Sequence, residues 1–279
     1  MSFLEKLLHN SHEVGVLEQD IYAQNLHRNV RLTILLPPEY HNPFFMFSHY
    51  RLLLVNDGQD FSALHMSQTI SKLYEEDKIK KIIVVGIHAN DQRLQEYGTA
   101  CSPDYKQRGA KAPLHTKFVV EELLPHLENH FRLKKDAEFR VYAGFSLGGL
   151  SALDVTWTNP TLFSKVGVFS GSLWWRKRSY EDHYDDHNDR IMHVQIRNTP
   201  NKPNLAFWLE AGTDDETSDR NNNGIIDAID DTLDLIKELE NKGFEYEKEI
   251  RYVQVSGGKH NQDTWGAVMP DFLIWAFGK

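Results

Sequence analysis

Short apolar runs alternate with longer amphipathic stretches along most of this chain. One run, residues 29–36, alternates polar and apolar side chains and stops at Pro37 and Pro38, as a strand does because proline cannot donate to a sheet ladder. Six further runs are almost continuously apolar, which is typical of strands buried on both faces of a mainly parallel sheet. They cover residues 52–55, 82–86, 139–143, 166–169, 205–209 and 252–255.

Between these runs, apolar residues return every three or four positions, which predicts amphipathic helices. We expect helices at about 61–75, 115–131, 147–158, 226–242 and 263–277. Strands that alternate with helices favour an α/β fold, in which right-handed crossovers place helices on both faces of one sheet. Two irregular stretches, 88–113 and 171–203, interrupt the pattern, and long insertions of this kind often carry function. We therefore expect residues 1–279 to form one domain with these two insertions.

The composition is that of an ordinary globular protein, with 41% hydrophobic and 25% charged residues. The formal net charge is -9, and no block of Lys and Arg is present to neutralise nucleic-acid phosphates or an anionic membrane surface. No segment approaches the roughly 20 apolar residues that a membrane span needs. Neither nucleic acid nor membrane is therefore an expected partner.

The compartment is predicted from two further features. The single cysteine, Cys101, cannot form an internal disulfide, which fits a reducing environment. Residues 1–14 contain only a short, charge-interrupted apolar run without a small-residue cleavage site, unlike a signal peptide. We expect a cytoplasmic protein, whose oligomeric state the sequence leaves open.

The segment GFSLGG, residues 144–149, lies where the run 139–143 meets the helix expected from Leu147. It fits G-x-S-x-G, in which a serine nucleophile occupies a sharp turn between strand and helix, and the glycines leave room for the flanking backbone. A glycine-rich turn with a capping serine is the alternative. The strand-turn-helix setting favours Ser146 as a nucleophile.

A serine nucleophile needs a base and a carboxylate that orients the base, and in this setting they follow in the order serine, acid, histidine. The glycine turn after the run 205–209 carries several carboxylates, of which Asp215 is the preferred acid and Asp214 the second choice. The glycine loop after the run 252–255 presents His260 just before the last helix. We predict that Ser146, Asp215 and His260 form a catalytic triad.

Acyl transfer also needs donors for the oxyanion. One is expected to be the backbone N–H of Leu147, directly after the nucleophile, and the other the N–H of Gln59 in the loop after the third strand. A simple Asp-Gly turn is the alternative for that loop. Trp174, Trp175 and Tyr97 are candidates for the wall of a substrate pocket, with core packing as the competing explanation.

The segment DRNNNGIIDAID, residues 219–230, matches the pattern of a calcium-binding loop. Its expected ligands are Asp219, Asn221, Asn223, the Ile225 carbonyl and Asp230. An Asn/Gly turn whose acids complement the dipole of the following helix is the alternative. A structural calcium ion is therefore a hypothesis, and we expect no cofactor to be required for catalysis.

Several motifs together resemble one known family. They are ILLPPEY at 34–40, LLLVNDGQ at 52–59, DQRLQEY at 91–97, EELLPHLENHFRL at 121–133, AGFSLGGLSAL at 143–153, FSGSLWW at 169–175 and GGKHNQDTW at 257–265. The chain resembles the "putative esterase" family of α/β-hydrolases, which includes enterochelin (siderophore) esterases, feruloyl esterases and S-formylglutathione hydrolase. The R-x-x-E-Y segment and the Gly-Gly histidine loop with its tryptophan are most similar to the enterochelin-esterase-like members.

The resemblance implies an α/β-hydrolase fold and a serine carboxylesterase with the same triad and oxyanion donors. The chain departs from this subgroup at Lys259, which stands between the glycine pair and His260 and requires the loop to bulge by one residue. The expected substrate is a small-molecule ester, cleaved through an acyl-enzyme. Two other functions stay open, an acyltransferase using the same triad and a non-catalytic scaffold that binds calcium or a partner.

Overall fold

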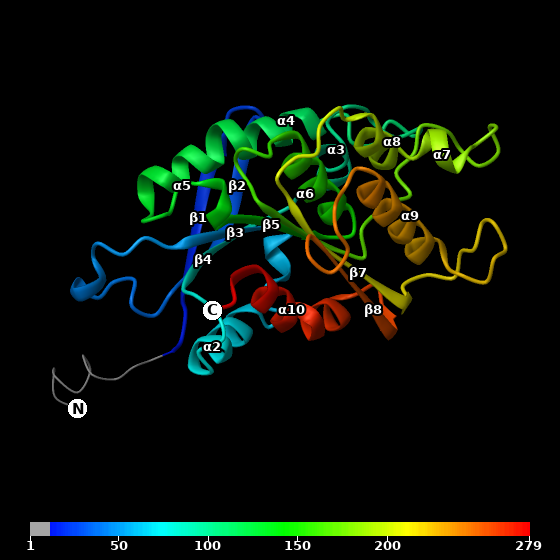
Figure 1. Ribbon diagram of the computed structural model, residues 1–279. Helices are drawn as coiled ribbons and strands as arrows, with labels where there is room; N and C mark the ends of the chain where they lie inside the picture. Colours follow the sequence, from blue (N-terminus) through cyan, green and yellow to red (C-terminus); the bar gives the residue numbers. More distant parts are fainter. Residues whose placement is uncertain (1–11) are drawn as a thin grey trace.

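The computed structural model describes residues 12–279, and their eight strands form one sheet with the order β1-β2-β4-β3-β5-β6-β7-β8 (Figure 1). β2 runs antiparallel to both of its neighbours, and the remaining pairs are parallel. The strands are β1 Gly15–Ala23, β2 Arg28–Leu36, β3 Arg51–Asn56, β4 Ile82–Ile87, β5 Arg140–Phe145, β6 Lys165–Phe169, β7 Ala206–Asp214 and β8 Ile250–Lys259. The mostly parallel sheet predicted from the apolar runs is confirmed.

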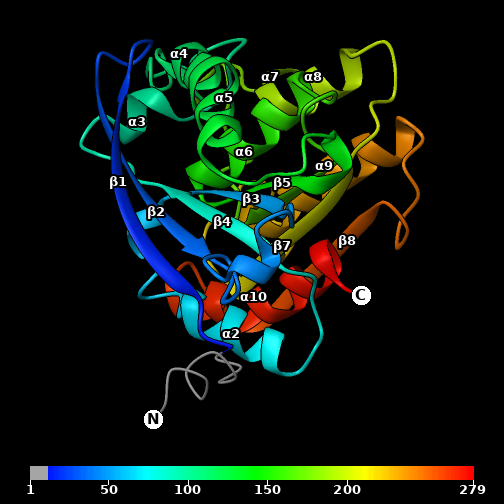
Figure 2. The ribbon, with the colours of Figure 1, turned by 90° about the vertical axis from the view of Figure 1, so that its left-hand side faces the viewer.

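β1 is the strand that the hydrophobic pattern did not predict. It lies at the edge of the sheet and pairs only with β2 (Figure 2). Most of its side chains are exposed, and it carries Glu18, Gln19 and Asp20 in succession. A strand that buries so little apolar surface leaves no apolar run in the sequence, and charged side chains are common on sheet edges.

The helices cover both faces of the sheet, as the alternation predicted (Figure 1). Their bounds are α2 Met66–Glu75, α3 Arg93–Glu96, α4 Ala112–Lys117, α5 Leu124–His130, α6 Leu147–Thr158, α7 Asp186–Asp189, α8 Ile191–Asn198, α9 Asp227–Asn241 and α10 Gln262–Phe277. A π-helical turn, Phe118–Leu123, joins α4 to α5. α2 and α10 pack on one face around an apolar cluster that includes Phe272, while α4, α5, α6, α8 and α9 cover a second cluster on the other face.

Two helix predictions need correction. The helix expected from residue 61 begins at Met66, because residues 58–60 form a short 3-10 turn and His65 takes a left-handed conformation with φ 51°. The insertion 171–203 is less irregular than predicted, since α8 runs through it. α8 has only eight residues, which is too short for a helical period to stand out from the sequence.

The parallel strands all end at the same edge of the sheet, and this places the predicted functional segments together. Ser146 follows β5, Asp215 follows β7, His260 follows β8, and Gln59 lies in the turn after β3. In open α/β sheets this carboxyl edge is where ligands bind.

No helix among residues 12–279 has both the length and the apolar character needed to cross a membrane. The expectation about a signal peptide concerns mainly residues 1–11, which lie outside the described residues. The assignment of residues 1–279 to one domain stays a prediction.

Candidate active site

Ser146 occupies a strained turn between β5 and α6. Its backbone has φ 53° and ψ -123°, a conformation that L-residues rarely adopt, and its N–H donates to the Phe169 carbonyl at 2.8 Å. A Cβ atom at Gly144 would lie 2.3 Å from the carbonyl oxygen of Gly148, so the turn closes only with glycine there. The sharp turn inferred from G-x-S-x-G is thus present in the backbone.

Within residues 12–279, the Ser146 hydroxyl has one hydrogen-bond partner, the hydroxyl of Ser172, with 3.4 Å between the two Oγ atoms. The Ser172 N–H also donates to the Ser146 carbonyl at 3.1 Å. Ser172 belongs to the family motif FSGSLWW, in which only the two tryptophans were predicted to be functional residues. The contact brings the start of the second insertion directly against the nucleophile candidate.

His260 follows β8 immediately, and the strand is longer than predicted. We expected it to end at Val255, but it continues to Lys259 through an irregularity in its pairing with β7. From the pair Gly212–Val255 to the pair Asp214–Lys259, the register advances two residues on β7 and four on β8. A Cβ atom at Gly212 would lie 2.3 Å from the Gly258 carbonyl oxygen, so the two backbones meet at van der Waals distance here.

Asp215 and His260 interact electrostatically. Burial raises the pKa of Asp215, while the nearby Ser170 hydroxyl, the Gly212 backbone and, to a smaller extent, His260 oppose this rise. Partial burial lowers the pKa of His260, Asp215 raises it, and Arg93 lowers it. Both carboxylate oxygens of Asp215 are buried without a hydrogen-bond partner among the described residues, whereas Asp214 is exposed.

No hydrogen bond joins His260 to Ser146 or to Asp215 in this structure. Catalytic hydrogen bonds are often long in ligand-free enzymes and shorten when substrate binds. The buried, unpaired carboxylate of Asp215 is nevertheless an acceptor without a donor, and burial of such a group is costly unless a partner is available.

The two predicted oxyanion donors lie at the starts of adjacent helical turns. Leu147 is the first residue of α6 and Gln59 the second residue of a 3-10 turn, positions whose N–H groups have no intrahelical acceptor. The Asn56 side chain joins the two segments. Its Nδ2 group donates to the Gly148 carbonyl at 2.8 Å, and its Oδ1 atom accepts from the Tyr142 hydroxyl at 2.7 Å. This buried network holds the loop after β3 against α6.

Two residues of the segment DQRLQEY, Arg93 and Tyr97, hold Asp57 in the loop after β3. Arg93 donates to both carboxylate oxygens of buried Asp57 at 2.7 and 2.8 Å, and it approaches the Phe145 carbonyl at 3.4 Å. The Tyr97 hydroxyl accepts from the Asp57 N–H at 3.4 Å. Asp57 has φ 63°, so this bidentate ion pair stabilises a left-handed residue two positions before Gln59, the predicted oxyanion donor.

The three aromatic pocket candidates differ in exposure. Trp175 and Tyr97 are buried in the core, and a Cβ atom at Gly98 would lie 2.7 Å from the Trp175 ring. Trp174 is partly exposed, and the Arg108 guanidinium lies 4.9 Å from its ring centroid. Trp174 is therefore the member of this group that a ligand could contact.

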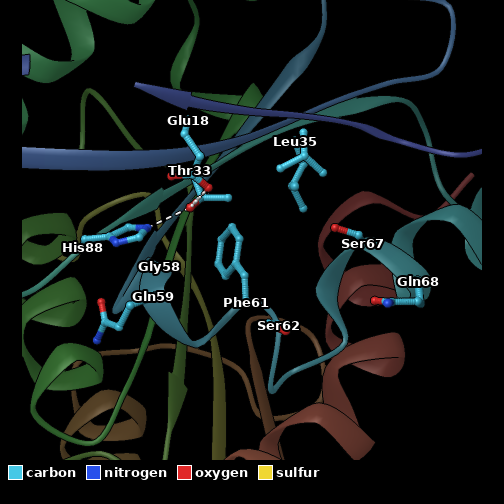
Figure 3. Close-up of a pocket in the computed structure, with 11 residues that line it drawn as sticks. Glu18, Thr33, Leu35, Gly58, Gln59, Phe61, Ser62, Ser67, Gln68 and His88 are labelled. Carbon is cyan, nitrogen blue, oxygen red and sulfur yellow. Dashed lines mark hydrogen bonds between the residues drawn. The ribbon is translucent and has the colours of Figure 1, made fainter. Parts of the chain in front are cut away.

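A pocket of about 300 Å³ lies beside the loop after β3, and Gly58, Gln59 and Phe61 of this loop line it (Figure 3). On its wall, the Thr33 hydroxyl bonds both to Glu18, at 2.7 Å, and to the His88 ring, at 2.7 Å. The Gln59 side chain accepts from the Ala89 N–H at 3.0 Å. The pocket thus adjoins the candidate site through the same turn that supplies Gln59.

The loop 219–230 projects between β7 and α9 (Figure 1) and has the internal hydrogen bonds of a calcium-type loop. Asp219 accepts from the N–H groups of Asn223 and Gly224, and Gly224 has φ 86°. The side chains of Asn221 and Asn223 both reach Asp230 Oδ2, at 2.9 and 2.7 Å. The loop contains three carboxylates, those of Asp219, Asp227 and Asp230, but no cluster of three or more His, Cys, Asp or Glu suited to a metal occurs in residues 12–279.

The calcium hypothesis stays a prediction with a direct thermal test. If the dissociation constant is about 10 µM, about 1 mM calcium raises the free energy of unfolding by about 2.7 kcal/mol, which is a rise in Tm of roughly 5–10 °C. Differential scanning calorimetry with calcium and with EDTA measures this rise. Asp230→Asn should remove it, and an unchanged Tm of the unaltered protein in calcium would reject the hypothesis.

Glu210 is a buried carboxyl that the sequence analysis did not single out. It lies in β7, and its Oε2 atom accepts from the N–H of Ser170 at 3.1 Å and the Ser170 hydroxyl at 3.4 Å. Burial, together with the charge of Asp215, raises the pKa of Glu210 to about 8. Near neutral pH this side chain is therefore protonated beside the candidate acid.

The raised pKa of Glu210 predicts that stability falls as the pH rises from about 4.5 to about 8. Between the usual pKa of Glu and about 8, the folded chain holds a proton that the unfolded chain has lost, so the free energy of unfolding falls by up to about 1.4 kcal/mol per pH unit. Glu210→Gln should reduce the fall between about pH 6 and pH 9 by about 2–3 kcal/mol. Urea denaturation across this range measures it; exposed Glu240→Gln is the control, and parallel curves for both variants would contradict the prediction.

Comparison with known proteins gives a family match over residues 23–276, to the family described as "Putative esterase". Among curated proteins, YbbA of Bacillus subtilis (strain 168) is 21% identical over 257 residues, covering 90% of this chain and 94% of YbbA. The endo-1,4-beta-xylanase/feruloyl esterase of Xylanibacter ruminicola is 27% identical over 107 residues, covering 38% of this chain and 13% of that protein.

Solved structures share the fold. A ferulic acid esterase superposes with a TM-score of 0.72 at 15% identity, over 95% of this chain and 98% of that one. The enterobactin esterase FES from Shigella flexneri, in the presence of enterobactin, gives a TM-score of 0.72 at 20% identity, over 95% of this chain and 59% of that one. At these identities the likeness concerns the fold alone, and it confirms the expected α/β-hydrolase fold.

Proposed function

Because this chain belongs to the "Putative esterase" family, whose chemistry is the hydrolysis of carboxylic esters, we propose that it is a serine esterase that cleaves small-molecule esters through an acyl-enzyme. The family resemblance drawn from the motifs is confirmed by the match, which spans residues 23–276. The observation that carries the serine mechanism is the backbone of Ser146, whose φ of 53° at the carboxyl edge of the sheet matches a nucleophile turn.

In the proposed first step, Ser146 Oγ attacks the ester carbonyl while its proton passes to a ring nitrogen of His260. The carbonyl π electrons move to oxygen, and the N–H groups of Leu147 and Gln59 stabilise the oxyanion. Collapse of the tetrahedral intermediate expels the alcohol, which takes the proton from His260. Asp215 accepts the other ring N–H and so fixes the tautomer.

In the second step, water attacks the acyl-enzyme and gives its proton to His260. The carbonyl is restored when the Ser146 oxygen leaves, and His260 returns the proton to it, so the enzyme is regenerated and a carboxylic acid is released. The buried, unpaired oxygens of Asp215 support its role, because they can accept the imidazolium N–H without displacing another donor.

Ester hydrolysis and covalent labelling together test the proposal. The purified protein should hydrolyse p-nitrophenyl esters from a panel that varies acyl length and aromatic character, and a fluorophosphonate probe should label Ser146, as located by peptide mass spectrometry. Added alcohols that divert most of the acyl group would favour acyl transfer over hydrolysis. Absence of both turnover and label would reject a serine esterase.

A further inference from the structure

We propose that Trp265 is a positioning residue that holds the imidazole of His260 in place beside the nucleophile turn. This inference rests on the proposed function, because it assigns Trp265 a part in the same proton transfer. Trp265 lies in the first turn of α10 and is 5% exposed.

One indole ring contacts both the base and the turn that bears the nucleophile. The rings of Trp265 and His260 meet edge to face, with centroids 5.2 Å apart and planes at 80°. Trp265 also stacks on Phe145, with centroids 5.1 Å apart and planes at 26°. Since Phe145 directly precedes Ser146, the indole acts as a spacer between the two catalytic candidates.

The indole is itself fixed by a hydrogen bond. Trp265 Nε1 donates to the Ser170 hydroxyl at 2.8 Å in the buried interior. Ser170 is held in turn by Glu210, whose backbone carbonyl and side-chain carboxyl both accept from the Ser170 N–H, at 2.9 and 3.1 Å. Ser170 has φ 44°, a strained conformation for a non-glycine residue. Its hydrogen bonds to Glu210 of β7 maintain this conformation, and its hydroxyl is the acceptor that fixes the indole N–H.

His260 depends on such packing because its ring makes no hydrogen bond within residues 12–279. It stands between the end of β8 and Asn261, whose side chain caps α10 by accepting from the Thr264 N–H. The backbone on either side is therefore fixed, while the imidazole orientation is left to its neighbours. Trp265 is the aromatic neighbour of this ring.

The same contact controls the electrostatics of the base. Asp215 raises the pKa of His260 and Arg93 lowers it, and burial, the largest effect, leaves this pKa below its usual value. His260 is exposed overall, and the indole covers one side of its ring with apolar surface, so a smaller ring at position 265 should admit more water on that side and return the pKa of His260 towards its usual value.

The test compares Trp265→Phe with Trp275→Phe, a matched change ten residues along the same helix. Trp275 packs against Trp208 and Phe272, with centroids 6.0 Å away in each case, and has no ring contact with His260. Trp265→Phe should lower kcat by about 10–100-fold with KM within about twofold, because the base is displaced while binding is kept. Trp275→Phe should leave both constants within about twofold.

A second readout does not depend on activity. NMR titration of the His260 ring should give a higher pKa in Trp265→Phe than in the unaltered protein, and no change in Trp275→Phe. Ser170→Ala, which removes the acceptor for the indole N–H, should shift kcat and the His260 pKa in the same directions as Trp265→Phe.

Equal kcat values and equal His260 titrations for the two tryptophan variants would overturn the proposal, even if both variants have lower Tm values. Failure of the esterase assignment would look different, since the unaltered protein would then neither turn over esters nor react with a fluorophosphonate.

Discussion

Replacing Ser146 with alanine is expected to lower kcat for ester hydrolysis by about 10⁴-fold or more, because the nucleophile is lost and only binding and the oxyanion donors remain. Initial rates with a p-nitrophenyl ester measure the loss. Ser151→Ala is the matched control, since Ser151 is buried on the same helix, α6, away from the turn. A Ser146→Ala enzyme that kept about a tenth of the rate would remove this residue from the mechanism.

The variant Ser146→Gly separates the effect of losing the hydroxyl on activity from the effect of backbone strain on stability. Ser146 has φ 53° and ψ -123°, and holding a non-glycine residue in such a region costs of order 1–3 kcal/mol. Glycine adopts this conformation freely but loses about 0.5–1 kcal/mol of backbone entropy, so Ser146→Gly should be inactive yet more stable by about 1 kcal/mol. Urea denaturation checks the gain, and a Ser146→Gly protein less stable than the Ser146→Ala protein would show that the turn is not strained.

Features whose physical cause is local could be predicted from the sequence. Strands buried on both faces must be apolar throughout, so the sequence predicted β3 to β6 from continuous apolar runs. The nucleophile turn requires glycine where a Cβ atom would collide, with the Gly148 backbone at Gly144 and with the Asp57 carboxylate at Gly148, and this requirement leaves a pattern within six residues. Family motifs added the order of the catalytic candidates along the chain.

Features that depend on a distant partner could not be predicted. The glycines after Val255 indicated a loop, yet β7 continues beside them and keeps the segment paired as far as Lys259. Glu210 was grouped with a turn, but its pairing with Phe169 on one side and Val253 on the other places it inside the sheet, where burial raises its pKa to about 8.

The contacts of Ser172 and Trp265 also depend on partners that are distant in the sequence. Both residues stand in motifs quoted from the sequence, FSGSLWW and GGKHNQDTW. Their roles became visible only when folding brought Ser172 to 3.4 Å from the Ser146 hydroxyl and Trp265 against His260. The sequence pattern favoured Asp215 over its neighbour Asp214 as the acid, and the burial of the Asp215 carboxylate beside an exposed Asp214 supports that preference.

Asp215→Asn is therefore expected to lower kcat by about 10³–10⁴-fold, while Asp214→Asn leaves kcat within about twofold. An amide at position 215 cannot stabilise the imidazolium and can donate to the ring nitrogen, which favours the wrong tautomer. Asp214 is exposed at the end of β7, so the same change there alters only surface charge. Steady-state kinetics of the two variants against one ester measure the difference, and the reverse ranking would assign the acid to Asp214.

The pH dependence of kcat/KM distinguishes the Asp215→Asn variant, which lacks the acid, from the Trp265→Phe variant, which lacks the indole beside His260. Burial and Arg93 hold the pKa of His260 below its usual value, against the effect of Asp215, so the acid limb of kcat/KM should lie below about pH 6.5. Asp215→Asn removes the one group that raises this pKa, and the limb should move to lower pH. Trp265→Phe should move it to higher pH by admitting water. If Asp215→Asn left the limb in place or moved it to higher pH, the charge of Asp215 would not act on the group that titrates in catalysis, and the assignment of His260 as the base would be contradicted. If Trp265→Phe moved the limb to lower pH, the indole would not be the surface that keeps water from the base.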